Sequence, residues 1–233
     1  MSGVDGGGRP AIQALIQAAG SGTRLGQGPK AFVLLGGQTL LERSIALFRE
    51  IADHVIVAVP SAELAKARAL VAGEWVDVIA GGASRSETTR RLVEHSSAPW
   101  LLLHDVVHPF ASPDLIKRVL EAAMNYGASA PAIPNAEFLY DMDGTALHAP
   151  GAVLIGQKPV GLSRAKLEAA YRESSPGPRA DPSVLEVLAA AGTPTRFVPG
   201  DRRNIKITDP ADLALARAMA ETDRRETETE ATE

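Results

Sequence analysis

Small residues and two cations follow the first apolar run of the chain, and together they suit a polyphosphate. The stretch Ala18-Ala19-Gly20-Ser21-Gly22 has no side chain larger than a hydroxymethyl group, so its backbone N–H groups can approach a ligand closely. Arg24 and Lys30 add positive charge a few residues later. Exposed amides beside cations at the end of a strand are well suited to bind phosphate groups.

The loop differs from two common phosphate-binding motifs. The dinucleotide fingerprint G-x-G-x-x-G would need glycine where the chain has Leu25. The P-loop needs glycine before its lysine and serine or threonine after it, whereas Lys30 lies between Pro29 and Ala31. An oxidoreductase is therefore a poor fit, and a plain glycine-rich turn with two solvated cations is the simplest alternative.

Three further polar clusters follow predicted strands. They are Gly81-Gly82-Ala83-Ser84-Arg85-Ser86, His104-Asp105-Val106-Val107-His108-Pro109 and Asn204-Ile205-Lys206-Ile207-Thr208. Each has a structural alternative: a turn at Gly81, a capping acid at Asp105, or a surface lysine at Lys206. His104 and His108 are four residues apart, but they flank a strand end and no third ligand is evident, so the pattern is weak for zinc.

The elements that would carry these clusters alternate between strand and helix. Strands are predicted at residues 11–17, 55–59, 76–80, 100–103, 128–133 and 195–198. Helices are predicted at residues 39–49, 84–94, 112–126, 164–172, 182–191 and 210–220, and one more begins at a Ser61 cap. The helix at 112–126 has Ser112 as its cap and Pro113 at its first position. This order predicts an α/β fold with a Rossmann-like, mainly parallel sheet and helices on both faces. Ligands of such sheets bind at the carboxyl ends of the strands.

Residues 135–159 interrupt this alternation and predict a β-arm that projects from the sheet. Two β-prone pieces, 138–142 and 152–155, flank a turn at Asp143-Gly144. The arm carries several large apolar residues, and such a surface is rarely left in water. We therefore expect a two-fold homodimer formed through the arm, with each arm reaching toward the partner's site.

Length and composition limit the remaining possibilities. We expect a flexible N-terminus over 1–10, one domain over 11–220 and a disordered acidic tail over 221–233. The 233 residues include no cysteine. The tail alone has a net charge of −4, which equals that of the whole chain, so a nearly neutral body offers no general nucleic-acid surface. No apolar run approaches the ~20 residues that span a membrane, and no signal peptide is evident, so we expect a cytoplasmic protein.

The order of the loop residues is more specific than their composition. A-A-G-S-G-T-R-L-x(4)-P-K resembles the signature of nucleotidyltransferases that join a nucleoside triphosphate to a sugar or alcohol phosphate. The following A-F-V-L-L-G-G-Q-T-L-L-E-R-S-I is similar to the methylerythritol phosphate cytidylyltransferases of the non-mevalonate isoprenoid pathway. The resemblance extends from about Ile12 to Ala218.

The resemblance implies a role for each cluster. It implies that CTP binds with Mg²⁺, that CMP is joined to an alcohol phosphate, and that pyrophosphate is released. Arg24, Lys30 and Lys206 match catalytic cations around the reacting phosphate, and Asp105 matches an acid near the ribose and the metal. The remaining nucleotide-binding positions are Ala18, Ala19, Gly20, Ser21, Gly22, Gly81, Gly82, Arg85 and Thr88.

The departures from the family pattern concentrate on the acceptor side. His108 replaces an arginine, Phe138 a threonine, Pro150 another arginine, and Lys158 the threonine of T-P-Q-F-F. Lys158 and His148 are candidates for substitute charge, and we expect His108 and Lys158 to bind the acceptor. Without such a substitute, activity on methylerythritol phosphate would be weak. The alternatives are another polyol phosphate, such as ribitol phosphate, and a non-catalytic nucleotide-binding paralogue.

Overall fold

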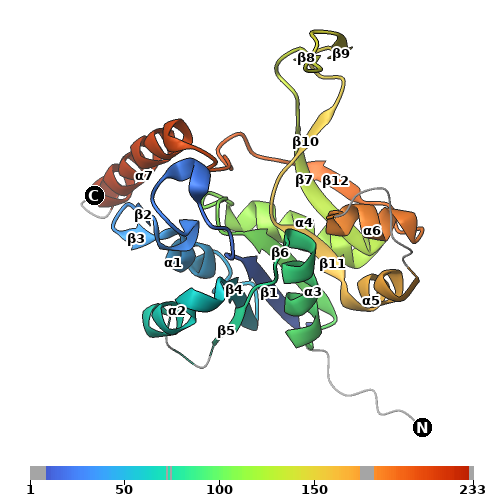
Figure 1. Cartoon of the computed structure of the whole chain (residues 1–233), viewed down its shortest axis with the longest axis horizontal. Coiled ribbons are helices and arrows are strands. Elements are labelled where there is room, and N and C mark those ends of the chain that lie inside the picture. The colour runs from blue at the N-terminus through green and yellow to red at the C-terminus, as the bar shows by residue number, and fades with distance from the viewer. Residues whose placement is uncertain (1–8, 72, 74, 174–180, 231–233) are drawn as a thin grey trace.

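A single large sheet forms the centre of the molecule (Figure 1). The computed structural model describes residues 9–71, 73, 75–173 and 181–230. Seven strands of the sheet follow the order β10-β7-β11-β6-β1-β4-β5, and β12 also pairs with β7. Their bounds are β1 Ile12–Gln17, β4 His54–Val59, β5 Val76–Ala80, β6 Trp100–Asp105, β7 Ala128–Pro134, β10 Leu154–Gly156, β11 Val160–Ser163 and β12 Arg196–Pro199.

The strands around β1 are parallel, as predicted. β1 pairs in parallel with both β4 and β6, and β4 pairs in parallel with β5. Gln17 lies opposite Asp105, and Val59 lies opposite Ala80. The carboxyl ends of these four strands therefore meet at one edge, which brings three of the predicted polar clusters together.

Strand β11 was not predicted, and it makes the sheet mixed. It pairs antiparallel with both β6 and β7, while β10 pairs antiparallel with β7. Val160, Gly161 and Leu162 are buried, and a Cβ at Gly161 would lie 2.7 Å from the Cβ of Ala123. The short run has no alternation to mark it as a strand, so only its partners on both sides define it.

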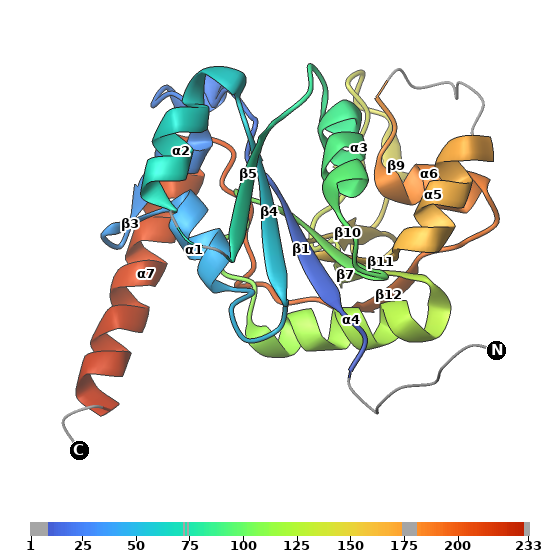
Figure 2. The same cartoon turned by 90° about the horizontal axis from the view of Figure 1, so that it is seen from below.

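Helices cover both faces of the sheet (Figure 2). Ile12, Ala14 and Ile16 of β1 face one core and Leu15 faces the other, as the two-residue period of a strand requires. The first core is covered by α1 Leu40–Ala46, α2 Leu64–Leu70, α4 Pro113–Tyr126 and α7 Pro210–Glu230. The second is covered by α3 Arg85–His95, α5 Arg164–Glu173 and α6 Val184–Ala190.

Side-chain caps set the starts of several helices. Ser112 caps α4, with Pro113 at the first helical position, as predicted. Ser84 caps α3 by accepting a hydrogen bond from the backbone N–H of Glu87. The predicted cap at Ser61 is wrong, because Ser61 begins a 3₁₀ turn and α2 starts at Leu64 without a side-chain cap.

The arm projects from the sheet, but its pairing differs from the prediction (Figure 1). Short strands β8 Leu139–Tyr140 and β9 Ala146–His148 pair antiparallel around the Asp143-Gly144 turn. Residues 154–156 instead form β10 and continue the sheet beside β7. A small hairpin, β2 Leu34–Leu35 and β3 Gln38–Thr39, was also not predicted.

The two ends of the chain differ in how far the structure describes them. Helix α7 continues through Glu230, so residues 221–230 are helical where a disordered tail was expected. Residues 1–8 of the expected flexible N-terminus and residues 231–233 of the expected tail lie outside the described residues. Within the described part of the chain, no helix has the length and apolar character needed to cross a membrane.

Candidate active site

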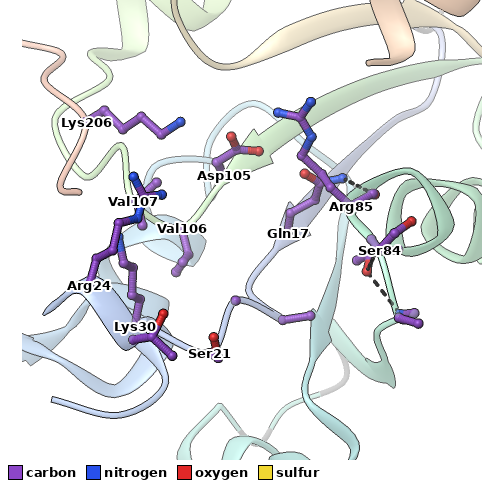
Figure 3. A pocket seen from close by; sticks show the side chains of 17 residues that line it. Gln17, Ser21, Arg24, Lys30, Ser84, Arg85, Asp105, Val106, Val107 and Lys206 are labelled. Carbon is purple, nitrogen blue, oxygen red and sulfur yellow. Dashed lines mark hydrogen bonds between the residues drawn. The ribbon is translucent and has the colours of Figure 1, made fainter. Parts of the chain in front are cut away.

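A cavity of about 590 Å³ lies at the edge where the parallel strands end (Figure 3). Its walls come from the loop after β1, the start of α3, the turn after β6 and the loop before α7. The lining residues are Gln17, Ala19, Gly20, Ser21, Gly22, Thr23, Arg24, Lys30, Gly82, Ala83, Ser84, Arg85, Thr88, Asp105, Val106, Val107 and Lys206.

The conformation of the loop after β1 requires glycine at position 22. Gly22 has a φ of 72°, and a Cβ there would lie 1.9 Å from the carbonyl oxygen of Gly28. The next residues form a 3₁₀ turn in which Leu25 is buried and Arg24 is exposed. The buried leucine therefore anchors the turn while the arginine is presented at the cavity.

A second loop packs directly against the first. A Cβ at Gly81 would lie 2.4 Å from the Cβ of Ala19, so the backbone after β5 can approach only because residue 81 has no side chain. The hydroxyl of Thr88 accepts a hydrogen bond from the N–H of Gly82 at 3.0 Å and donates to the carbonyl of Ser84 at 2.8 Å. These contacts set the shape of the wall beside α3.

Three predicted cations gather on one side of the cavity. The ammonium of Lys30 donates hydrogen bonds to the carbonyl oxygens of Ile207 and Thr208. Burial lowers the pKa of Lys30, and the nearby charges of Arg24 and Lys206 lower it further. This mutual repulsion indicates a region of positive potential that a polyphosphate would neutralise.

Asp105 lies across the cavity from these cations, and Figure 3 shows Lys206 pointing toward it. Its Oδ1 atom is 3.6 Å from the Nζ of Lys158. Burial tends to raise the pKa of Asp105, but nearby positive charge, above all that of Lys158, outweighs it and lowers the pKa. The carboxylate is therefore ionised at neutral pH, and its Oδ1 has no hydrogen-bond partner among the described residues.

His108 does not occupy the position expected of an acceptor-binding residue. Its side chain is buried, and it lines neither the main cavity nor the smaller one beside it. Burial is the largest cause that lowers the pKa of His108 to about 4 and that of His104 to about 3, so both rings are neutral at pH 7. A neutral, buried imidazole supplies no charge to a phosphate.

The two histidines also do not form a metal centre with their neighbours. Their ring centroids are 6.4 Å apart in an edge-on arrangement. Among the residues that the structure describes, no group of three or more His, Cys, Asp or Glu side chains is arranged to hold a metal ion.

A smaller cavity of about 150 Å³ adjoins the first and shares Gln17 and Arg85 with it. Lys158 lines it, whereas Asp105, its ion-pair partner, lines the main cavity. The remaining lining residues are Thr89, Leu103, Ala130, Gly156, Gln157, Val160, Pro182, Ser183, Val184 and Leu185. Lys158 and Asp105 thus mark the junction of the two cavities.

The predicted residues divide into three groups. Most line the main cavity, while Lys158 lines the smaller one. Ala18, Gly81 and His108 line neither cavity, and Ala18 and His108 are buried. Sequence reasoning missed Gln17, although a polar residue at the last position of an apolar strand was a usable signal; it also missed Thr23, Ala83, Ser84, Val106 and Val107 as lining residues.

A glycine loop after the first strand, a cluster of cations and an adjoining small cavity define a nucleotidyltransferase-type site on an α/β fold. The family described as 2-C-methyl-D-erythritol 4-phosphate cytidylyltransferase matches residues 12–222. The chain belongs to this family.

Individual relatives agree with the family assignment. The 2-C-methyl-D-erythritol 4-phosphate cytidylyltransferase of Deinococcus radiodurans is 39% identical over 213 residues, covering 90% of each chain. That of Thermus thermophilus is 38% identical over 212 residues, covering 90% of this chain and 97% of the relative. A solved structure of the Thermus thermophilus enzyme aligns with a TM-score of 0.77 and 35% identity, covering 91% of this chain and 99% of that one.

Proposed function

We propose that this protein transfers the cytidylyl group of CTP to 2-C-methyl-D-erythritol 4-phosphate. An oxygen of the acceptor's phosphate attacks the α-phosphorus, the bond from that phosphorus to the β-phosphate bridging oxygen breaks, and pyrophosphate leaves. The observation that carries this proposal is the junction of a cation-lined cavity with a smaller one at Asp105 and Lys158. The product is the activated alcohol as its cytidine diphosphate ester.

The nucleotide would occupy the larger cavity. Ala19, Gly20 and Ser21 would lie against its sugar and phosphates, with Ala18 supporting them from behind. Gly82, Arg85 and Thr88 would surround the base, with Gly81 permitting the close approach of the two loops. Backbone amides and carbonyls at such a wall can select cytosine by its hydrogen-bonding edge.

Catalysis would rest on positioning and charge. A phosphate monoester is already a nucleophile, so little proton transfer is needed. Arg24, Lys30 and Lys206 face the place where the triphosphate would lie and would stabilise the charge that develops on the leaving pyrophosphate. The ammonium of Lys30 is held by two backbone carbonyl oxygens before the substrate arrives, which lowers the cost of reorganisation.

The site fits Mg²⁺ as a cofactor. The carboxylate of Asp105 is ionised and borders the cavity, and its Oδ1 lacks a hydrogen bond within the described chain. Mg²⁺ commonly takes one or two protein carboxylates and completes its shell with substrate phosphates and water. When bound, the ion would neutralise phosphate charge beside Asp105.

Lys158 would supply the positive charge for the acceptor's phosphate. Its ammonium lies at the junction of the cavities, where the attacking oxygen must reach the α-phosphorus. The family pattern places an arginine at position 108, but His108 is buried and neutral, so Lys158 is the better candidate. Ribitol phosphate or another polyol phosphate is the second candidate acceptor.

The arm would form a homodimer. Its exposed large side chains include Phe138 and Tyr140, each 58% exposed, and Met142, which is fully exposed. A second copy of the chain would cover this surface and bring each arm toward the partner's site. His148, exposed on β9 of the arm, would then add charge to the acceptor site.

One assay tests the activity. Pyrophosphate release is measured in the presence of Mg²⁺ with each of the nucleotides CTP, ATP, UTP and GTP. Each nucleotide is paired with each of four acceptors: methylerythritol 4-phosphate, erythritol phosphate, ribitol phosphate and glycerol phosphate. We expect CTP and methylerythritol phosphate to be preferred, with a kcat/KM of ~10⁴ M⁻¹s⁻¹ or more. A higher kcat/KM for another polyol phosphate would reassign the acceptor. Tight CTP binding without any turnover would support a non-catalytic paralogue.

A further inference from the structure

Two buried side-chain amides join the base of the arm to the loop that carries Lys206. Gln157 follows β10 and is 7% exposed, while Asn204 precedes Lys206 by two residues and is 1% exposed. Neither lies in a helix or strand. We call Gln157 and Asn204 the amide pair.

Gln157 uses both ends of its amide on the loop after β12. Its Nε2 donates to the carbonyl oxygens of Asp201 at 2.7 Å and Asn204 at 3.2 Å, and its Oε1 accepts from the N–H of Asp201 at 3.0 Å. Its own backbone N–H donates to Pro131 of β7 at 2.7 Å. Four hydrogen bonds therefore connect this residue to the loop and to the sheet.

Asn204, in the loop after β12, donates a hydrogen bond back to the base of the arm. Its Nδ2 donates to the carbonyl oxygen of Lys158 at 2.6 Å, so the loop holds the backbone of the residue that faces Asp105. The backbone of Gly200 also approaches closely, since a Cβ there would lie 2.3 Å from the Oε1 of Gln157. The two segments are thus packed together and not merely adjacent.

The amide pair matters because both cations lie on irregular backbone. Lys158 precedes β11, and Lys206 lies in a segment without helix or strand. Beyond Lys206, Ile207 is held by its N–H bond to Val107 at 2.9 Å and by the Lys30 ammonium. Before Lys206, the side-chain hydrogen bonds of the amide pair tie the segment to the base of the arm.

We propose that Gln157 and Asn204 are positioning residues, which hold Lys158 and Lys206 on two sides of Asp105 for cytidylyl transfer. This inference rests on the proposed function. Asn204 lines neither cavity, so it acts through the lysines. Gln157 lines the smaller cavity, but both ends of its side-chain amide are hydrogen-bonded to the loop after β12, so it acts through that loop. A shift of about 1 Å in such a group can lower the rate by about 100-fold.

The test uses neutral variants of similar size, Gln157→Met and Asn204→Leu, in the full-length protein. We expect kcat to fall about 10- to 100-fold and the KM for the acceptor to rise. The dissociation constant of CTP, measured by calorimetry, should change less than about threefold, because the loops after β1 and β5 are untouched. Gln157→Glu, which keeps its size and its acceptor for Asp201, replaces Gln157→Met if that variant fails to fold.

A double-mutant cycle separates positioning from general stability. In a Lys158→Ala background, Asn204→Leu should lower kcat/KM by a clearly smaller factor than it does in the wild-type background, because one of the two lysines through which it acts is already absent. Ser129→Ala is the matched control: it removes a buried hydroxyl that donates to Val119 away from both cavities. It should lower the melting temperature and leave kcat within about twofold.

The outcomes distinguish this proposal from the proposed function. If wild-type protein releases no pyrophosphate with any acceptor, the proposed function fails. If wild-type protein is active and the amide variants keep wild-type kcat, or lose it equally in the Lys158→Ala background, the positioning role is wrong.

Discussion

The ammonium of Lys30 donates hydrogen bonds to the backbone carbonyl oxygens of Ile207, at 2.9 Å, and of Thr208, at 3.0 Å. Lys30 and Ile207 are 177 residues apart in the chain. The lysine therefore joins the glycine loop after β1 to the segment that carries Lys206. It contributes charge to the cavity and also links two of its walls.

Lys30→Ala should lower kcat by about 10²–10³, because one preorganised cation is lost. Two hydrogen bonds from a charged group are lost as well, so the free energy of unfolding should fall by about 1–2 kcal/mol. Steady-state kinetics and urea titration measure both. Lys117→Ala, on the exposed surface of α4, is the control and should change neither. Turnover by Lys30→Ala within about threefold of wild type would make Lys30 a bystander.

Gly20 and Gly81 should respond differently to alanine. A Cβ at Gly20 would meet no protein atom within 4 Å, and Gly20 lines the main cavity. Gly20→Ala should therefore keep or slightly raise the melting temperature and weaken CTP binding about tenfold or more, since the methyl group takes ligand space. Gly81→Ala should lower both the melting temperature and the affinity for CTP, because its Cβ would overlap Ala19. Unchanged CTP affinity in Gly20→Ala would place the nucleotide elsewhere.

The buried histidines predict a loss of stability in mild acid. The pKa of His104 is about 3 and that of His108 about 4, both below the ordinary 6.5, chiefly because burial disfavours the charged ring. The unfolded chain therefore binds these protons more readily, and stability is lost as the pH falls below about 6.5. Each histidine contributes a slope of up to about 1.4 kcal/mol per pH unit.

His108→Leu tests this pH dependence. Urea unfolding is measured at several pH values between 7 and 4.5. The free energy of unfolding of His108→Leu should fall less steeply with decreasing pH than that of wild type, with a slope that is smaller by the uptake of about one proton. Parallel curves for His108→Leu and wild type would mean that His108 is not held neutral by the fold.

Charged substitutions on the exposed apolar surface of the arm should break the proposed dimer. Phe138 and Tyr140 are both more than half exposed, with ring centroids 6.5 Å apart. Phe138→Asp combined with Tyr140→Asp should convert a dimer into a monomer in sedimentation at micromolar concentration, because charge opposes burial of the patch. Leu215→Asp, at an exposed position on α7, should leave the dimer intact. A monomeric wild-type protein under the same conditions would contradict the dimer.

Short contiguous patterns were readable from the sequence. The start of α4 followed from a serine cap with proline next to it, and β5 matched its predicted residues 76–80. The loop after β1 that lines the main cavity was readable too, because its small residues and cations lie within 13 positions, Ala18 to Lys30. In each case the side chains that determine the local backbone are neighbours in the chain.

The sequence by itself therefore determined the family, the parallel part of the sheet and most of the residues that line the main cavity. Only the tertiary structure decided that β11 lies antiparallel between β6 and β7, that His108 is buried, and that Lys158 faces Asp105. It also decided that Gln157 and Asn204 join the arm to the loop before Lys206. These features depend on partners that are tens of residues away, and no local pattern of side chains specifies which distant backbone a buried group will meet.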